Sequence, residues 1–163
     1  MSEVLENNAV ASVLTGLVQE AAYLCGRDID ASTDEMCACT QEGKCRSILA
    51  MTSEVIGFNH LIAGLLRGET MSFPTSEERD AFAASISSKE LAKAGLEAST
   101  GAVVAAIEAI EPGDWMTKIM APWGMEVTKA HLCSWSALHM MYHDGQINLL
   151  QILNGDNVVH WMS

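Results

Sequence analysis

The chain has 163 residues, of which 49% are hydrophobic and 18% charged, and its 9 basic and 21 acidic residues give a formal net charge of −12. This composition is typical of a globular protein and excludes a disordered or fibrous one. The acidic surface disfavours phosphate backbones and anionic headgroups, so we expect neither nucleic acid nor a membrane as a partner.

The N-terminal residues MSEVLENNAV are acidic and lack a basic segment followed by an apolar run, so we expect no signal peptide. No stretch approaches the roughly 18–20 consecutive apolar residues of a membrane span. Five cysteines in a chain without a secretory signal favour thiols over disulfides. We therefore expect a cytoplasmic protein.

The first predicted helix begins near the N-terminus. Apolar residues recur at helical spacing from Val10 to Leu24, which places them on one face, and Gly26 is expected to end the helix. A polar loop is predicted over residues 27–45.

Three cysteines, Cys37, Cys39 and Cys45, fall in this loop with the spacing CxC-x5-C. Zinc and iron–sulfur sites use four thiolates, usually in CxxC pairs, so this spacing disfavours a metal cluster. Redox sensing and incidental loop thiols both stay open, and the sequence assigns these cysteines no role.

Further helices follow in chain order. A second long helix is predicted over 46–67, with Gly68 as its cap. The segment TSEE at 75–78 matches a capping box and opens a short helix. A third long helix is predicted over 88–110 and a fourth over 126–153, joined by the irregular connection WMTKIMAPWG.

Four long amphipathic helices with no internal repeat and no clear linker predict one all-α domain over residues 1–163. The expected architecture is an antiparallel four-helix bundle. Because the connections after the first and second helices are longer than a minimal bundle needs, we expect a crossover connection.

Two histidines stand out on the fourth helix, in the stretch LHMMYHDGQINLLQ. At about 100° per residue, His139 and His143 lie about 40° apart on the interior face, where two imidazoles can reach one metal ion. The same spacing also occurs in core histidines that are bonded to carbonyls or carboxylates, so both interpretations stay open. Gln146 follows one turn later and is placed to orient a ligand.

The segments HMMYHDGQINLLQILNGD, MAPWG and SEVIGFNHLIAGLLRGE together resemble the DinB/YfiT-like superfamily. The resemblance covers about residues 46–153 and is most specific in the fourth helix, where two histidines precede GQI. It implies a four-helix bundle with a crossover connection, often a homodimer. It also implies a divalent-metal site with three ligands from the second and fourth helices.

Carried onto this chain, the resemblance assigns His139 and His143 as ligands. The third ligand departs from the usual histidine, because the position five residues before Asn59 holds Glu54. Glutamate oxygen is an acceptable ligand for zinc and similar ions. His60 is the alternative third ligand, but it lies nearer the polar side of its helix.

We therefore expect a metal-dependent enzyme whose divalent ion, zinc, nickel or iron, activates water or a thiol. The resemblance implies a small-molecule substrate, including low-molecular-weight thiols, and leaves hydrolysis and thiol transfer open. Asp144 and Gln146 are candidates to support the ligands, although the helical phase of Asp144 places it on the exposed side. The alternative is a non-catalytic interaction or stress-response protein with structural histidines.

Overall fold

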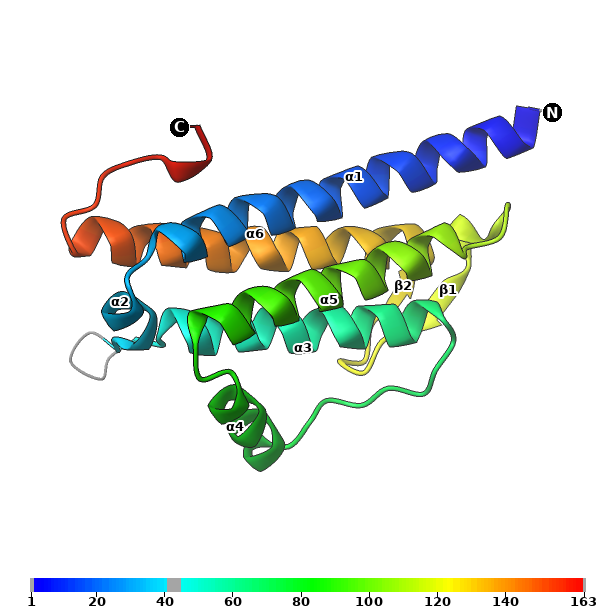
Figure 1. The fold of residues 1–163 in the computed structure, drawn as a ribbon. Helices are drawn as coiled ribbons and strands as arrows, with labels where there is room; N and C mark the ends of the chain where they lie inside the picture. Colours follow the sequence, from blue (N-terminus) through cyan, green and yellow to red (C-terminus); the bar gives the residue numbers. More distant parts are fainter. Residues whose placement is uncertain (1, 41–44, 163) are drawn as a thin grey trace.

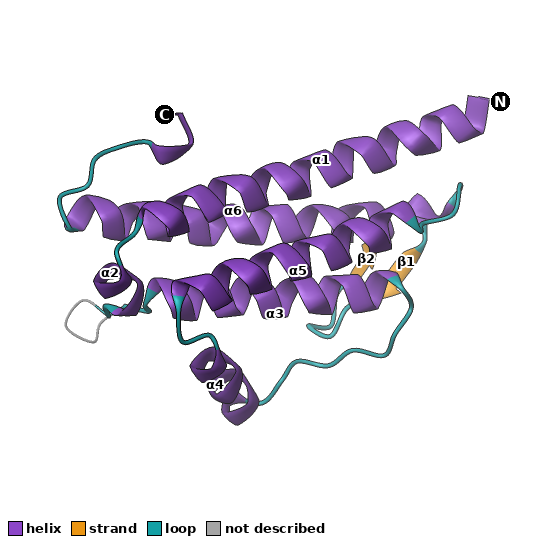
Figure 2. Cartoon of the chain, in the orientation of Figure 1, coloured by secondary structure: helices purple, strands orange, loops and turns teal. Residues whose placement is uncertain are grey.

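The computed structural model describes residues 2–40 and 45–162 (Figure 1). Helices dominate it, and the two short strands form the small sheet seen in Figure 2. The four long helices are α1 (Ser2–Ala31), α3 (Ile48–Leu66), α5 (Lys89–Glu108) and α6 (Lys129–Leu153). Two short helices, α2 (Asp34–Ala38) and α4 (Ser76–Ser85), lie in the connections.

The long helices form a four-membered bundle, as predicted. Each of α1 and α3 packs against both α5 and α6. Helices α3 and α6 are antiparallel neighbours, as are α1 and α5, whereas α3 and α5 run in the same direction. The chain must therefore return along the bundle between α3 and α5, which confirms the crossover connection.

Local sequence signals explain where the helices begin. Ser47, Thr75, Ser88 and Thr128 each accept a hydrogen bond from the backbone N–H three residues later, which satisfies an otherwise unpaired donor. Thr75 also receives the reciprocal bond of a capping box from Glu78, as its sequence predicted.

The predicted end of the first helix at Gly26 is wrong. Helix α1 continues to Ala31, because the inward pattern extends through the fully buried Cys25 and Ile29. The predicted loop is correspondingly shorter and contains α2. Its residues 41–44 lie outside the described part of the chain.

The cysteines of this region do not share one environment. Cys37 is buried, Cys39 is half-buried and Cys45 is exposed, and no disulfide joins the cysteines that the structure describes.

The connection expected to be irregular contains a β-hairpin. Strands β1 (Lys118–Met120) and β2 (Glu126–Thr128) pair antiparallel, with Ile119 opposite Val127. Helix α6 consequently begins at Lys129 and not at 126, because the preceding three residues belong to β2. Gly124, with φ of +80°, occupies the turn, where glycine adopts this conformation without steric cost.

Two helical stretches have the length and apolar composition of a membrane-crossing helix, Ala9–Ala31 and Ile48–Leu66. The second is α3, most of which is buried against α5 and α6, and this burial accounts for its apolar composition. Neither stretch is an uninterrupted apolar run, since α3 contains Glu54, Asn59 and His60.

Candidate metal centre

The two histidines of α6 lie side by side at the interface with α3. Their Nε2 atoms are 3.2 Å apart, and their rings are nearly perpendicular at 87°. The side chain of His143 is 1% exposed, while His139 is half-buried against the ring of Phe58 at a centroid distance of 4.3 Å. The interior position predicted for the pair is therefore what the structure shows.

Glu54 reaches the pair from α3. Its Oε2 atom lies 3.8 Å from His143 Nε2, and one candidate ligand atom from each of Glu54, His139 and His143 lies within 4.8 Å of the others. Among the described residues, this is the one group of three or more such side chains compact enough to hold an ion. His60 is exposed and does not belong to it.

The register of α3 against α6 produces this meeting. One turn beyond Glu54 on α3, the buried Asn59 accepts a hydrogen bond from the hydroxyl of Ser136 and lies close to Met140. Because the helices run antiparallel, the residues before Asn59 face those after Ser136. Glu54 is thus placed opposite His139 and His143 by a buried polar contact.

Gln146 fixes the orientation of the second histidine. Its Oε1 atom lies 2.9 Å from His143 Nδ1, so the imidazole N–H donates at Nδ1 and leaves the Nε2 lone pair toward Glu54 and His139. A hydrogen bond of this kind typically sets the tautomer of a metal-binding histidine. The role suggested for Gln146 by its position in the sequence fits this geometry.

Both imidazoles are held in the neutral form. Burial lowers the pKa of His139 to about 4, helped by the charges of His143 and Arg46. Burial also lowers the pKa of His143, against the opposing effect of the Gln146 hydrogen bond. A neutral imidazole is the form that binds metal, so near neutral pH neither ring has to lose a positive charge before an ion enters.

The donor spacing fits a metal ion. Two nitrogens that each lie 2.0–2.1 Å from one tetrahedral zinc are roughly 3.4 Å apart, and the observed Nε2–Nε2 distance is 3.2 Å. The Nδ1 atom of His139 is buried and has no hydrogen-bond partner among the described residues. Two nitrogens and one carboxylate oxygen leave a tetrahedral position for water or a substrate.

A cavity of about 720 Å³ opens beside the three residues, between α3, α4 and the segment that leads into α4. Glu54 and His139 line it together with the aromatic side chains of Phe58, Phe73 and Phe82. Such a volume with mostly apolar walls and a few polar groups suits a small organic molecule.

Two features of the site were not predicted. Arg46, just before the cap of α3, forms an ion pair with Glu54 Oε2. Trp123, from the MAPWG segment, stacks on Trp135 at 4.7 Å and lies 6.3 Å from the Phe58 ring, so it supports the wall behind His139. An arginine eight residues before a glutamate carries no recognisable sequence signal, because the pairing depends on the chain path into α3.

Asp144 does not lie on the exposed side of α6, where its helical phase predicted it. It is 3% exposed and faces the buried carboxyl group of Asp28 on α1 instead of solvent or the histidines. Burial, followed by the charge of Asp28, raises the pKa of Asp144 to about 7. Asp144 therefore does not support the metal ligands directly.

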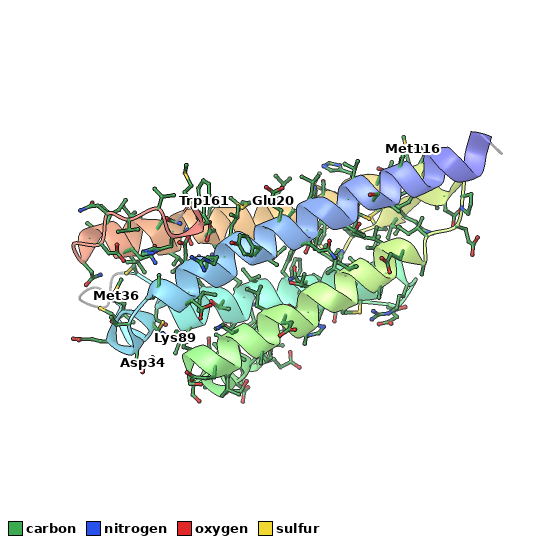
Figure 3. All side chains as sticks on the ribbon, turned by 45° about the horizontal axis from the view of Figure 1, so that its top comes forward. Glu20, Asp34, Met36, Lys89, Met116 and Trp161 are labelled. Atoms are coloured by element: carbon green, nitrogen blue, oxygen red, sulfur yellow. The ribbon has the colours of Figure 1, made fainter. Side chains whose placement is uncertain are left out.

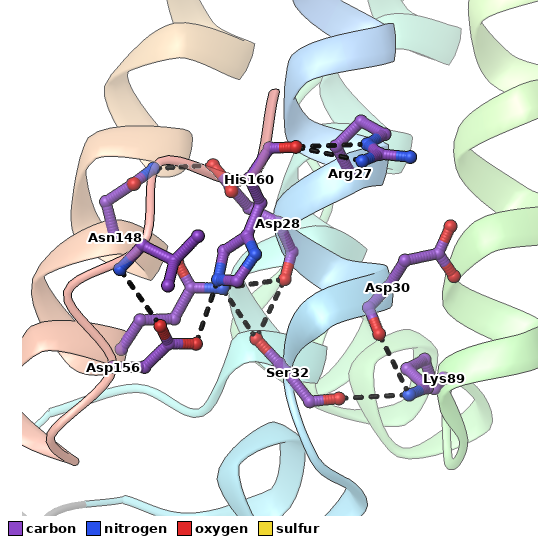
Figure 4. A network of polar contacts seen from close by, with 10 residues as sticks. Arg27, Asp28, Asp30, Ser32, Lys89, Asn148, Asp156 and His160 are labelled. Atoms are coloured by element: carbon purple, nitrogen blue, oxygen red, sulfur yellow. Dashed lines mark hydrogen bonds and ion pairs between the residues drawn. The ribbon is translucent and has the colours of Figure 1, made fainter. Parts of the chain in front are cut away.

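A network of polar contacts around Asp28 joins α1 to α6 and to the C-terminal segment (Figure 4). Asn148 donates to Asp28 Oδ2 at 2.6 Å, and Gln151 donates to the Asp28 carbonyl at 2.9 Å. The guanidinium of Arg27 donates to the carbonyl of His160. These bonds fix the back of α6, on the side away from Glu54.

No family model and no curated protein matches this sequence. Solved structures do: the fold is that of the DinB/YfiT-like helical proteins, as the sequence resemblance implied.

One match is the colibactin self-resistance protein ClbS, crystallised in complex with a double-stranded DNA. Its TM-score is 0.68 at 18% identity, and the alignment covers 86% of this chain and 94% of that one. Another is a point mutant of the mycothiol-dependent maleylpyruvate isomerase, with a TM-score of 0.64 at 16% identity. That alignment covers 84% of this chain and 60% of the isomerase.

The complex of ClbS with DNA overturns one expectation drawn from charge. A net charge of −12 was taken to exclude nucleic acid, yet a protein of the same fold has been crystallised with duplex DNA. Net charge is a property of the whole surface, and a local face can differ from it. The exclusion of nucleic acid is therefore withdrawn.

Proposed function

We propose that the protein is a metal-dependent enzyme in which Glu54, His139 and His143 bind one divalent ion beside the substrate cavity. The observation that carries this proposal is the convergence of three ligand atoms from α3 and α6 within 4.8 Å. A bound ion would act as a Lewis acid that lowers the pKa of a water or thiol, which makes a nucleophile available near neutral pH.

The chain's own residues hold and shape this site. Gln146 keeps the proton of His143 on Nδ1, so the Nε2 atom stays available as a ligand. Phe58 packs on the His139 ring and restricts its rotation. The aromatic side chains of Phe58, Phe73 and Phe82 on the cavity wall offer apolar contacts to a substrate.

The substrate is a small molecule that fits the cavity of about 720 Å³. Thiol chemistry is a candidate because a protein of the same fold is a mycothiol-dependent isomerase. Hydrolysis is the other candidate, because an open position on such an ion also accepts water. Zinc, nickel and iron all suit a site of two imidazoles and one carboxylate.

The proposal is tested on protein stripped with a chelator and reloaded separately with zinc, nickel or iron(II). Each form is assayed with a panel of esters and amides, and with low-molecular-weight thiols paired with electrophiles. We expect turnover with at least one metal and its loss in His143→Ala. Absence of turnover from every fully loaded form would favour the alternative of a non-catalytic protein with structural histidines.

A further inference from the structure

Arg46 lies beside the proposed metal ligands but has no role in the metal chemistry proposed above. Its Nη1 atom contacts Glu54 Oε2, the carboxylate oxygen that also lies 3.8 Å from His143 Nε2. The Arg46 side chain is 47% exposed and lines the cavity together with Glu54 and His139.

Metal binding would remove this partner from Arg46. An ion held by the two Nε2 atoms needs Glu54 Oε2, and a carboxylate oxygen that coordinates a divalent ion is a poorer acceptor for a guanidinium. This step rests on the proposed function. The Arg46–Glu54 ion pair has no net charge, so a divalent ion adds two positive charges at the inner end of the cavity.

Two other charged residues of the cavity wall at the start of α4, Glu78 and Arg79, already have partners. Glu78 accepts the capping bonds from Thr75, and Arg79 donates to the Pro74 carbonyl and the Ser76 hydroxyl. Arg46 is therefore the cavity cation that metal binding would release. In a chain of net charge −12, this creates a local attraction for anions.

We propose that Arg46 binds the acid group of the substrate, and that the substrate is a carboxylate with an apolar or aromatic body. Guanidinium matches carboxylate in a two-bond geometry. The rings of Phe58, Phe73 and Phe82 on the cavity wall suit the rest of such a molecule. Metal and carboxylate then increase each other's affinity, because each favours the arrangement in which Arg46 has left Glu54.

The test compares 3-phenylpropionate with the neutral 3-phenylpropionamide by isothermal titration calorimetry, in metal-free and zinc-loaded protein. The variants are Arg46→Gln and, as a matched control in the same cavity, Arg79→Gln. We expect zinc to raise the carboxylate affinity of the wild type by roughly 10- to 100-fold, the equivalent of one charge-assisted bond. The amide should show no such increase.

Arg46→Gln should abolish the zinc-dependent increase, and Arg79→Gln should retain it. Without carboxylate, Arg46→Gln should also bind zinc more tightly than the wild type, because the competing guanidinium is gone. If Arg46 only held Glu54 in place, Arg46→Gln would instead bind zinc more weakly than the wild type.

Failure of the proposed role of Arg46 and failure of the proposed metal site give different results. Zinc binding with an unchanged carboxylate response in Arg46→Gln, or loss of that response in Arg79→Gln alone, would overturn the role of Arg46 and leave the metal site standing. Failure of the wild type to bind zinc would overturn the proposed function and this inference together.

Discussion

His139 Nε2 and His143 Nε2 lie 3.2 Å apart, on the face of α6 that meets Glu54 of α3. Without an ion, a proton must lie between these nitrogens, because two lone pairs at that distance repel. With an ion, both lone pairs are used, and the distance suits two ligands of one tetrahedral centre. This relationship leads to the following predictions.

Replacing the third ligand should weaken the metal site selectively. Glu54→Gln removes the carboxylate charge but keeps its shape, so we expect zinc affinity to fall by at least about tenfold. His60→Gln is the matched control, since it changes an exposed residue one to two turns further along α3. Competition against a chromophoric chelator measures both affinities, and a larger loss in His60→Gln would reverse the choice of ligand.

Gln146 should influence metal binding without touching the ion. Gln146→Leu removes the acceptor for His143 Nδ1–H, and loss of such a partner typically costs about 10- to 100-fold in affinity. Gln146→Glu retains an acceptor and should restore most of the affinity. If the leucine variant binds zinc like the wild type, the hydrogen bond does not orient the ligand.

The buried pair Asp28 and Asp144 should make stability depend on pH. The pKa of Asp144 is raised to about 7 in the folded protein, so the folded state binds its proton more strongly than the unfolded state. The free energy of unfolding contributed by this group is therefore highest below about pH 4. It falls as the pH rises toward about 7 and is constant above that.

Asp144→Asn should remove this dependence. Urea unfolding at pH 5 and pH 8, in the presence of a chelator, should show the variant gaining stability relative to wild type on going to pH 8, by on the order of 2 kcal/mol. The lowered pKa of His139 acts in the opposite direction in both proteins and cancels in the comparison. An equal pH response in the two proteins would contradict the raised pKa of Asp144.

Self-association is expected through the outer face of α6. Between positions 138 and 152 its exposed residues form an uncharged stripe: Leu138, Met141, Tyr142, Gly145, Leu149 and Ile152. Gly145 has open space around its Cβ position, so the bundle gives no packing reason for a glycine that weakens the helix. A second α6 crossing there would approach closely, and an acidic chain can meet a copy of itself most easily on a neutral face.

Sedimentation equilibrium should accordingly find a dimer for the wild type and a monomer for the double variant Leu138→Glu, Leu149→Glu. Met116→Glu is the control, because Met116 is also exposed but lies outside the α6 stripe, in the connection before β1 (Figure 3). A monomeric wild type would contradict the prediction of a homodimer.

Periodicity was sufficient to predict the bundle and the interior position of the histidines, and the TSEE motif predicted the capping box at Thr75. Periodicity failed for Asp144, because α6 contacts α1 as well as α3, and its buried arc is wider than one stripe. The choice between Glu54 and His60 depends on the register set by Asn59 and Ser136, which no local pattern encodes. The hairpin at 118–128 was missed because three-residue strands are too short to show alternation.

The most direct test of the metal centre is the metal content of untagged protein, measured by inductively coupled plasma mass spectrometry after gel filtration. We predict close to one divalent ion per chain in the wild type and almost none in His143→Ala and His139→Ala, with circular dichroism showing that both variants stay helical. Less than about 0.2 ions per chain in the wild type, unchanged in either variant, would contradict the metal site.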